Sequence, residues 1–239
     1  MSIDWQSSPK TKPNSISEMA LPSNVKEILL RCEKKGDFRH CIMAGSYGTG
    51  KTTSARILAR LIDEHFVEHD CNIKGSKDNF LELTKNLLTQ NLYQLVKTGT
   101  SKRVVILDEF HDADQRAQNV FKKFMEDWAE KVKVIICVND YNKVSPAISD
   151  RCVYLDFDVA VLDADKRTGK PKLLIHPDTG FNNADEWIAE LERTVDIIAK
   201  KLDVKLTKKM KESVRSNPHN LQSVRSYVRS MQNAYEDFS

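Results

Sequence analysis

The stretch "GSYGTGKTT", from Gly45 to Thr53, fits the pattern G-x-x-x-x-G-K-[ST]. Its glycines allow backbone N–H groups to turn inward onto phosphate oxygens, and its lysine adds a positive charge. A glycine-rich turn without a ligand would show the same letters. The motif therefore predicts a phosphate-binding loop only where a buried strand precedes it and a helix follows it.

The flanking sequence supplies both elements. Before the loop, "RHCIMAG" (39–45) is a short apolar run that is typical of a buried parallel strand. After it, "KTTSARILARLIDEHF" (51–66) has apolar residues at helical spacing, which predicts an amphipathic helix whose N-terminal dipole favours phosphate. The apolar positions are Ile57, Leu58, Leu61 and Ile62. This order of elements predicts a nucleotide-binding site.

We expect this site to bind ATP together with Mg²⁺. Lys51 is expected to reach the β- and γ-phosphates, and the Thr52 hydroxyl is expected to hold the metal ion. The other residues of this loop that are predicted to bind the nucleotide are Gly45, Ser46, Tyr47, Gly48, Thr49, Gly50 and Thr53.

A second apolar run, "KRVVILDEF" (102–110), ends in two carboxylates. Asp108 and Glu109 follow the apolar part directly, at the strand end where open α/β sheets place their ligand chemistry. Asp108 is predicted to bind Mg²⁺, and Glu109 is predicted to polarise an attacking water, which favours hydrolysis over binding alone. A surface acidic pair is the alternative, which the nearby phosphate loop disfavours.

Two more apolar runs complete the predicted sheet. "VKVIICVND" (132–140) ends near Asn139, a neutral polar residue that can orient the water or contact the γ-phosphate. "CVYLDFD" (152–158) follows it. The repeated alternation of strands and helices predicts an α/β fold with a mainly parallel sheet and helices on both faces.

The remainder of the chain has a different pattern. Residues 159–182 carry turn signals around a short apolar run, which predicts an inserted hairpin or loop. Residues 183–239 predict a small all-helical lid, with helices after Asn183, after Thr207 and after "SNPHN" (216–220). The first 158 residues are then the P-loop domain.

Composition excludes several classes of protein. The chain has 239 residues, of which 40% are hydrophobic and 30% charged, and no apolar run reaches the length of a membrane span. Its five cysteines are scattered without a metal-binding spacing. The start lacks the apolar core of a signal peptide. We expect a cytoplasmic protein (in the host cytoplasm if it is viral) that does not bind membranes.

Together these elements resemble an AAA+ ATPase, and more narrowly the small subunit of a sliding-clamp loader of the T-even bacteriophage and replication factor C type. Residues 11–22, "TKPNSISEMALP", are similar to the family's N-terminal box, which cups the adenine and adds Pro13 to the predicted nucleotide site. Residues 117–127, "AQNVFKKFMED", resemble the helix that follows the acidic pair. "AISDRC" (147–152) resembles the Ser-Arg-Cys motif, with Asp150 in place of serine.

The resemblance implies a function and partners. Arg151 falls on the arginine finger, which would act in trans on a neighbouring subunit's nucleotide. The chain would then hydrolyse ATP in an oligomer held by AAA+ interfaces, with other clamp-loader subunits, a sliding clamp and the backbone of primer–template DNA as partners. The alternatives are another DNA-transaction ATPase, such as a helicase loader, and a non-hydrolysing scaffold. Glu109 and Arg151 argue against the scaffold.

Basic residues after the P-loop helix and after the acidic pair are the predicted DNA contacts. In the resembling family, helices in these regions follow the DNA backbone. No aromatic residues alternate with the basic ones, so we expect binding to be independent of sequence. The residues are Lys74, Lys77, Arg116, Lys122 and Lys123. A second basic run, between residues 198 and 230, is interpreted as a solvated face.

Two further departures from the resembling family concern the lid and the assembly. The family has an arginine at the start of the third lid helix, where the nearest positions here hold His219 and Leu221. Arg225 lies a turn away; it is interpreted as solvated, with substitution for the family's arginine as the alternative. The family also has a helical collar domain, for which no room is left before Ser239. We therefore expect this chain alone to associate weakly.

Overall fold

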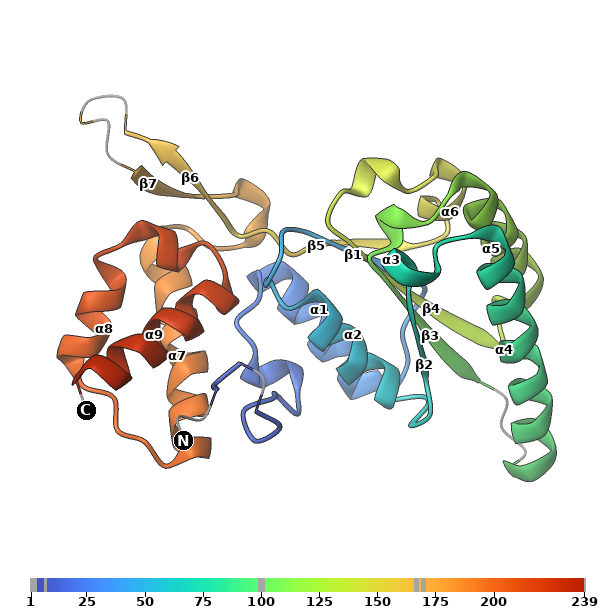
Figure 1. Cartoon of the computed structure of the whole chain (residues 1–239), viewed down its shortest axis with the longest axis horizontal. Helices are drawn as coiled ribbons and strands as arrows, with labels where there is room; N and C mark the ends of the chain where they lie inside the picture. The colour runs from blue at the N-terminus through green and yellow to red at the C-terminus, as the bar shows by residue number, and fades with distance from the viewer. Residues whose placement is uncertain (1–3, 7, 99–101, 166–167, 169–170, 239) are drawn as a thin grey trace. The chain divides into compact units, whose positions relative to one another are not determined.

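Five parallel strands form the sheet that carries the glycine loop (Figure 1). The computed structural model describes residues 4–6, 8–98, 102–165, 168 and 171–238. Along the sheet the order is β2–β3–β4–β1–β5, and every neighbouring pair is parallel, so the predicted sheet is confirmed. The strands are β1 (Cys41–Ala44), β2 (Val67–Asp70), β3 (Arg103–Asp108), β4 (Val132–Val138) and β5 (Val153–Asp156).

Contacts within the chain divide it into two compact units. The sheet unit comprises Leu29–Gly45 and Lys51–Asp156. The helical unit comprises Met1–Ile28, Ser46–Gly50 and Phe157–Ser239, so the tip of the glycine loop groups with the helices. None of the helices in the described ranges combines the length and the hydropathy that a bilayer-spanning segment needs.

Helices cover both faces of the sheet in the sheet unit. The helix α2 (Lys51–Arg60) packs against β3 and β4, and α4 (Lys77–Thr98) and α5 (Gln115–Trp128) lie together on the opposite face (Figure 1). Phe80 of α4 meets Phe121 of α5 edge to face, with ring centroids 5.6 Å apart. The buried side chains of the apolar strands complete this core.

The helix after the glycine loop is shorter than the sequence predicts. It ends at Arg60 instead of continuing to residue 66. The chain turns there because Asp63 is buried against β3, where its carboxylate pairs with Arg103 at 3.3 Å and accepts the Val104 N–H at 3.1 Å. The following strand β2 was not predicted, because three of its four residues are polar and it contains no apolar run.

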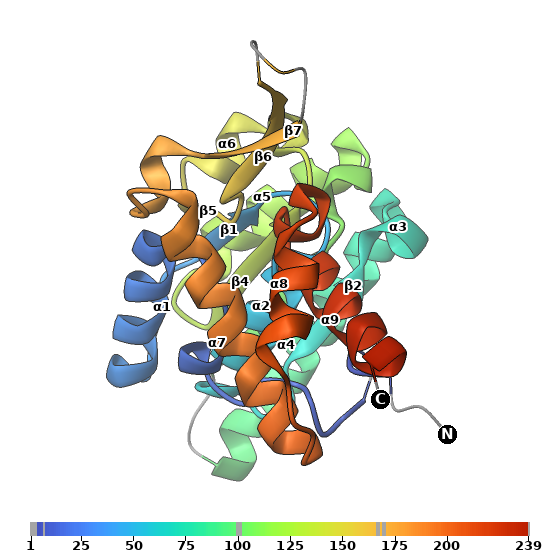
Figure 2. The ribbon, with the colours of Figure 1, turned by 90° about the vertical axis from the view of Figure 1, so that its left-hand side faces the viewer.

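The helical unit is built on a hairpin and three α-helices (Figure 2). Strands β6 (Ala160–Ala164) and β7 (Pro171–Ile175) pair antiparallel. The α-helices are α7 (Ala184–Leu202), α8 (Lys208–Arg215) and α9 (Val224–Phe238), and α1 (Ser23–Lys35) begins in this unit. The core around Trp187 includes Leu191, Val195, Tyr227 and Met231.

The third of these helices begins later than the sequence predicts. Asn217 caps a 3₁₀ turn, Pro218–Leu221, by accepting the His219 N–H at 3.1 Å. The α-helix starts only at Val224, where the Ser223 hydroxyl accepts the Ser226 N–H at 3.2 Å. The chain thus contains two N-terminal caps in succession, and the second one starts the helix. The other short helices are α3 (Cys71–Lys74), α6 (Pro146–Ser149) and the 3₁₀ turns Ile16–Glu18, Phe110–Asp112, Tyr141–Lys143 and Pro177–Thr179.

His40 ties the strand before the glycine loop to both of its neighbours. Its Nδ1 accepts the Val134 N–H at 3.1 Å, and its carbonyl accepts the Val153 N–H at 2.8 Å. Burial, reinforced by the positive charges of Lys133 and Arg39, lowers the pKa of His40 to about 4. The folded protein therefore resists protonation of this ring.

Acidification is expected to destabilise the protein through His40. Because the unfolded chain takes up the proton more readily, stability that is present above pH 6.5 is lost as the pH falls toward about 4. His40→Asn keeps an acceptor near Nδ1 and has no proton to take up. At about pH 5 it should therefore lose about 1 kcal/mol less of its free energy of unfolding than the wild type, allowing for partial exposure. Urea unfolding of both proteins across this range measures the difference. Equal losses in both would contradict the assignment to His40.

Candidate functional site

The glycine loop has the backbone that phosphate binding requires. Gly48 and Gly50 have φ angles of 78° and 100°, which L side chains rarely adopt. At the end of the loop Lys51 opens α2, and its buried Nζ donates to the Gly45 carbonyl at 2.6 Å. Thr52 and Thr53 follow in the first turn of the helix. The strand, loop and helix occur in the order that the motif demands.

Within the helical unit, Arg225 lies against the tip of the loop. Its backbone N–H donates to the Gly48 carbonyl at 3.2 Å, and a Cβ at Gly48 would stand 2.6 Å from the Arg225 Cβ. Arg225 is exposed, in keeping with its interpretation as solvated, so the contact consists of its backbone N–H and the inner part of its side chain. Only a glycine allows this approach. Sequence spacing gave no sign of it, because the contact joins residues far apart in the chain.

Other residues of the helical unit also contact the loop tip. The Ser46 N–H donates to the Asp158 carboxylate at 2.7 Å. Met19 and Leu21 belong to the segment that resembles the adenine box, and their side chains lie 3.0 and 3.4 Å from a Cβ placed on Gly50. Pro13 is partly exposed and lies earlier in the same segment. Its contact with the nucleotide stays a prediction.

Thr52 and Asp108 form a pair of oxygen donors in the sheet unit. The Thr52 hydroxyl lies 3.0 and 3.2 Å from the two carboxylate oxygens of Asp108. Burial raises the pKa of Asp108, and the hydrogen bond from Thr52 opposes that shift. A partly buried carboxylate beside a hydroxyl suits Mg²⁺, which takes few protein oxygens and completes its shell with water and phosphate. The residues present therefore fit the predicted metal ion.

A chain of hydrogen bonds joins the predicted lysine, the predicted base and Asn139, here called the sensor because it is expected to contact the γ-phosphate or orient the water. Lys51 Nζ donates to Asn139 Oδ1 at 2.9 Å, and Asn139 Nδ2 donates to Glu109 Oε2 at 2.7 Å. These residues come from the start of α2 and from the positions just after β4 and β3. The parallel sheet brings all three to the side where its strands have their C-terminal ends. The structure thus brings together in space three residues that the sequence analysis had assigned separately.

Glu109 has an unusual backbone, and sequence reasoning missed its neighbour His111. Glu109 adopts a left-handed conformation with φ of 51°, which is uncommon for a residue other than glycine. The 3₁₀ turn Phe110–Asp112 follows it at once and returns the chain toward the carboxylate. His111 Nε2 then lies 3.4 Å from Glu109 Oε2. No sequence pattern used above would have identified this histidine.

Comparison with known families agrees with this geometry. Residues 41–157 match the family model "ATPase family associated with various cellular activities (AAA)". The chain contains an AAA domain. This domain spans β1 to the end of β5 and so includes the whole sheet and every residue of the Lys51–Asn139–Glu109 chain.

Curated relatives of the AAA domain are replication factor C small subunits. The chain is 28% identical over 153 residues to replication factor C small subunit 1 of Pyrobaculum islandicum, which covers 62% of this chain and 45% of the relative. It is 25% identical over 162 residues to a putative replication factor C small subunit of Acanthamoeba polyphaga mimivirus, with 63% and 45% covered. The chain therefore spans about half the length of the curated relatives it matches.

Solved structures support the fold over almost the whole chain. The Thermotoga maritima RuvB Holliday junction branch migration motor matches with a TM-score of 0.59 at 15% identity, covering 95% of this chain and 73% of RuvB. A point mutant of the same motor gives a TM-score of 0.66 at 16% identity, covering 93% and 64%. This likeness confirms the predicted architecture, in which helices follow an AAA domain.

Arg151, the predicted finger, lies at the surface of the AAA domain. It follows α6 (Pro146–Ser149) and precedes β5, in the short turn that the sequence predicts. Its guanidinium donates to the Ala147 carbonyl and pairs with Glu126 of α5. The side chain is about one third exposed, so this ion pair is weak and replaceable.

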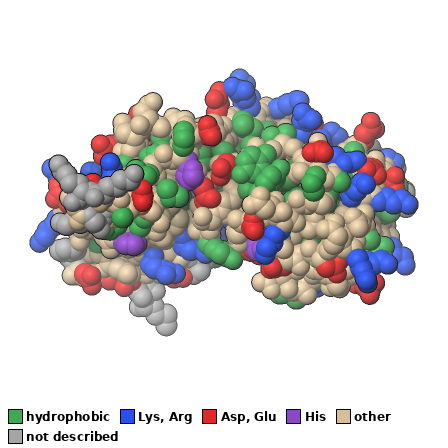
Figure 3. Space-filling model, turned by 90° about the horizontal axis from the view of Figure 1, so that it is seen from above, with side chains coloured by type: hydrophobic (Ala, Val, Ile, Leu, Met, Phe, Trp, Pro, Cys, Tyr) green, Lys and Arg blue, Asp and Glu red, His purple; other side chains and the backbone are tan. Residues whose placement is uncertain are grey.

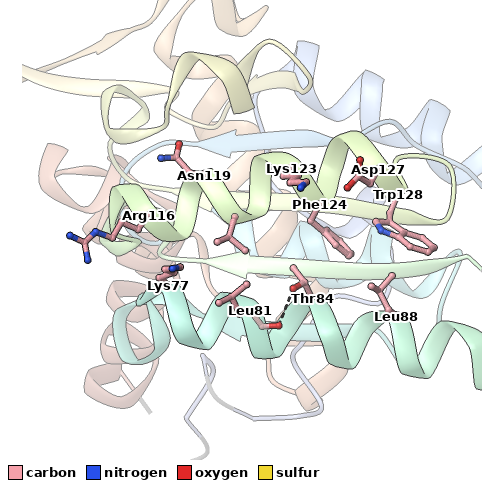
Figure 4. A pocket seen from close by; sticks show the side chains of 11 residues that line it. Lys77, Leu81, Thr84, Leu88, Arg116, Asn119, Lys123, Phe124, Asp127 and Trp128 are labelled. Carbon is pink, nitrogen blue, oxygen red and sulfur yellow. Dashed lines mark hydrogen bonds between the residues drawn. The ribbon is translucent and has the colours of Figure 1, made fainter.

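Three of the five predicted DNA-binding residues line a groove in the AAA domain. The groove has a volume of about 490 Å³ and lies between α4 and α5 (Figure 4). Lys77, Arg116 and Lys123 line it, with Lys77 and Arg116 at one end and Trp128 at the other. The apolar part of its lining consists of Leu81, Leu88, Val120, Phe124 and Trp128.

The five predicted residues do not all lie in this groove. Lys122 projects elsewhere on α5, where its Nζ is 4.0 Å from the Glu126 carboxylate, and Lys74 is exposed at the end of α3. Over the half of the molecule that carries α4 and α5, lysine and arginine side chains stand at several points with acidic ones among them (Figure 3). The basic surface is thus local, as the net charge of +3 suggests.

Proposed function

We propose that the AAA domain hydrolyses ATP with Mg²⁺ and that the chain is an ATP-driven subunit of a sliding-clamp loader acting at primer–template DNA. The observation that carries the proposal is the hydrogen-bonded chain of Lys51, Asn139 and Glu109 at the edge of the sheet. A charged lysine, a polar sensor and a carboxylate base in contact are the parts that phosphoryl transfer to water needs.

In the proposed reaction, the loop residues 45–53 hold the phosphates through backbone N–H groups, and Lys51 exchanges its present acceptors for the β- and γ-phosphates. Thr52 and Asp108 hold Mg²⁺, which neutralises charge on the phosphates when bound. Glu109 takes a proton from water as the water oxygen bonds to the γ-phosphorus and the bond to the bridging oxygen breaks. Asn139 contacts the γ-phosphate and orients that water. Pro13 contacts the adenine.

The partners and the cellular setting follow from the curated relatives. Those relatives are named as replication factor C small subunits, and the chain covers about half of each. We therefore infer a sliding clamp, further loader subunits and the DNA backbone as partners, in an oligomer where Arg151 reaches a neighbour's nucleotide, in the cytoplasm. The proposed domains are residues 1–158 for the ATPase, 159–182 for the inserted hairpin and 183–239 for the lid.

Stimulation of ATP hydrolysis tests this function. Phosphate release by the chain is measured alone, with primer–template DNA, with a sliding clamp, and with all components of the loader. The proposal requires stimulation by primed DNA together with the clamp. Stimulation by a replicative helicase and not by the clamp would instead support a helicase loader, and hydrolysis that no component changes would oppose both.

DNA binding is expected to depend on the basic groove. Replacing Lys77, Arg116 and Lys123 by alanine together should weaken DNA binding equally for all sequences. It should also reduce the slope of log affinity against log salt by about 2 to 3, because each lost phosphate contact removes about one released counterion. Fluorescence anisotropy across a salt series measures both effects.

A matched variant controls for loss of net charge. Lys200, Lys205 and Lys208 lie in the second basic run, which is interpreted as a solvated face, so their replacement by alanine should leave the slope unchanged. If the two triple variants behave alike, DNA does not bind at the groove between α4 and α5.

A further inference from the structure

His111 closes a ring with the predicted base and sensor. Its Nε2 lies 3.4 Å from Glu109 Oε2, and its Nδ1 lies 3.5 Å from the backbone nitrogen of Asn139. The Asn139 side chain contacts the same Glu109 oxygen at 2.7 Å. The His111 side chain is only 10% exposed, so it is held in this position by the protein and not by solvent.

The backbone contact fixes which ring nitrogen carries the proton. An N–H group can only donate, so the Asn139 backbone makes His111 Nδ1 the acceptor. In the neutral ring the proton then stands on Nε2, which lies 3.4 Å from Glu109 Oε2. This Nε2–H group is therefore close enough to Glu109 Oε2 for a small shift to make it a donor. Glu109 Oε2 thus accepts the Asn139 amide and has the His111 ring beside it.

We propose that His111 is a positioning residue. It orients Glu109 for proton abstraction while the Asn139 amide contacts the γ-phosphate of the nucleotide. This inference rests on the proposed ATP hydrolysis. A γ-phosphate oxygen accepts hydrogen bonds and so draws the same Asn139 amide that now donates to Glu109. In the proposed arrangement His111 donates to Glu109 without being a ligand of the nucleotide, so this contact does not depend on which way that amide turns.

The local backbone supports this role. The left-handed conformation of Glu109 is uncommon and costs free energy, so the surrounding structure must impose it. It is held by the Glu109 N–H, which donates to the Asp108 carboxylate at 3.2 Å, and by the Glu109 carbonyl, which accepts the Asp112 N–H at 3.0 Å. The same turn brings His111 back onto the carboxylate. One strained residue thus places both the base and its donor.

Two substitutions separate the two polar contacts of the ring. His111→Gln keeps an N–H donor near the position of Nε2, whereas His111→Asn keeps only an acceptor near Nδ1. His111→Phe keeps the size of the ring and removes both. Hydrolysis by the full-length chain is measured as kcat and KM for ATP with Mg²⁺, and ATP binding is measured separately with a fluorescent analogue.

The donor to Glu109 should decide the rate. We expect kcat to fall about 10- to 100-fold in His111→Phe and His111→Asn, which is the effect of losing one hydrogen bond to a charged group. His111→Gln should recover most of that loss, and KM and ATP binding should stay within about twofold in all three. A purely structural role would instead rank the variants by thermal stability. Equal rates in the glutamine and asparagine variants, or a wild-type rate in His111→Phe, overturn the proposal.

A double-substitution cycle ties the effect to Glu109. In a Glu109→Gln background the carboxylate is absent, so His111→Phe should cause little further loss of kcat. A further full loss in that background would show that His111 acts elsewhere. Failure of the wild-type chain to hydrolyse ATP under any condition would oppose the proposed function itself, and that outcome is distinct from an active enzyme that ignores these substitutions.

Discussion

Glu109→Gln is expected to bind ATP normally and to lose hydrolysis by about 10³-fold. The amide keeps the size of the side chain and can still meet Asn139, whose Nδ2 lies 2.7 Å from the carboxylate. It cannot take a proton from water, and general-base catalysis contributes roughly 10²- to 10⁴-fold. Lys51 and the backbone of the loop, which are expected to hold the phosphates, are unchanged. Nucleotide titration and phosphate release measure the two properties separately.

Lys51→Ala is the matched control for this variant. It removes the buried ammonium that now contacts Gly45 and Asn139, and it should abolish ATP binding together with hydrolysis. The two variants therefore separate binding from chemistry within one hydrogen-bonded chain. Turnover at the wild-type rate by Glu109→Gln would show that another group activates the water.

The sequence predicts those parts of the site that follow apolar strands. Asp108, Glu109 and Asn139 each come directly after a buried run, and in a parallel sheet the ends of such runs share one edge. The loop is predicted as well, because its glycines and lysine must occur in one order. Direct contact between Asn139 and Glu109 was not predicted, since side-chain direction depends on the left-handed turn at Glu109.

The features that sequence analysis missed depend on contacts between distant segments. Strand β2 lies at the edge of the sheet and has little apolar pattern, so no periodicity marks it. Arg225 and Gly48 are far apart in the sequence, so spacing could not reveal their contact. The glycine that the contact requires is already explained by the phosphate-loop motif. Asp63 ends α2 early because a buried partner on β3 outweighs local helix spacing.

Arg151, the predicted finger, shows the same limit of sequence analysis. Its position in the turn before β5 agrees with the resemblance, but its pairing with Glu126 could not be inferred from spacing. In this structure the guanidinium is satisfied by its own chain, through Glu126 and the Ala147 carbonyl. To act on a neighbour it must exchange both for phosphate oxygens. That exchange is feasible because a partly exposed ion pair stabilises little, whereas a phosphate offers a stronger and doubly charged partner.

Arg151→Ala is expected to leave ATP binding nearly intact and to lower hydrolysis by about 10³-fold or more in the assembled complex, which is the contribution of such fingers. Arg60→Ala, at an exposed position at the end of α2, is the control for loss of a surface arginine and should hydrolyse normally. Nucleotide titration and phosphate release with DNA and partner subunits measure the two properties. A similar loss in both variants would argue against a specific role for Arg151.

If Arg151 acts in trans, a mixture of two inactive variants should regain some ATP hydrolysis. Arg151→Ala protein keeps an intact phosphate loop, and Lys51→Ala protein keeps an intact finger. Where the two meet in the right order, one complete site forms from two defective chains, so the mixture should recover part of the hydrolysis that neither variant shows alone. Mass photometry confirms that mixed complexes form under the same conditions. If such complexes are present and remain as inactive as their parents, Arg151 does not serve the site of a neighbour, and its pairing with Glu126 is its main structural role.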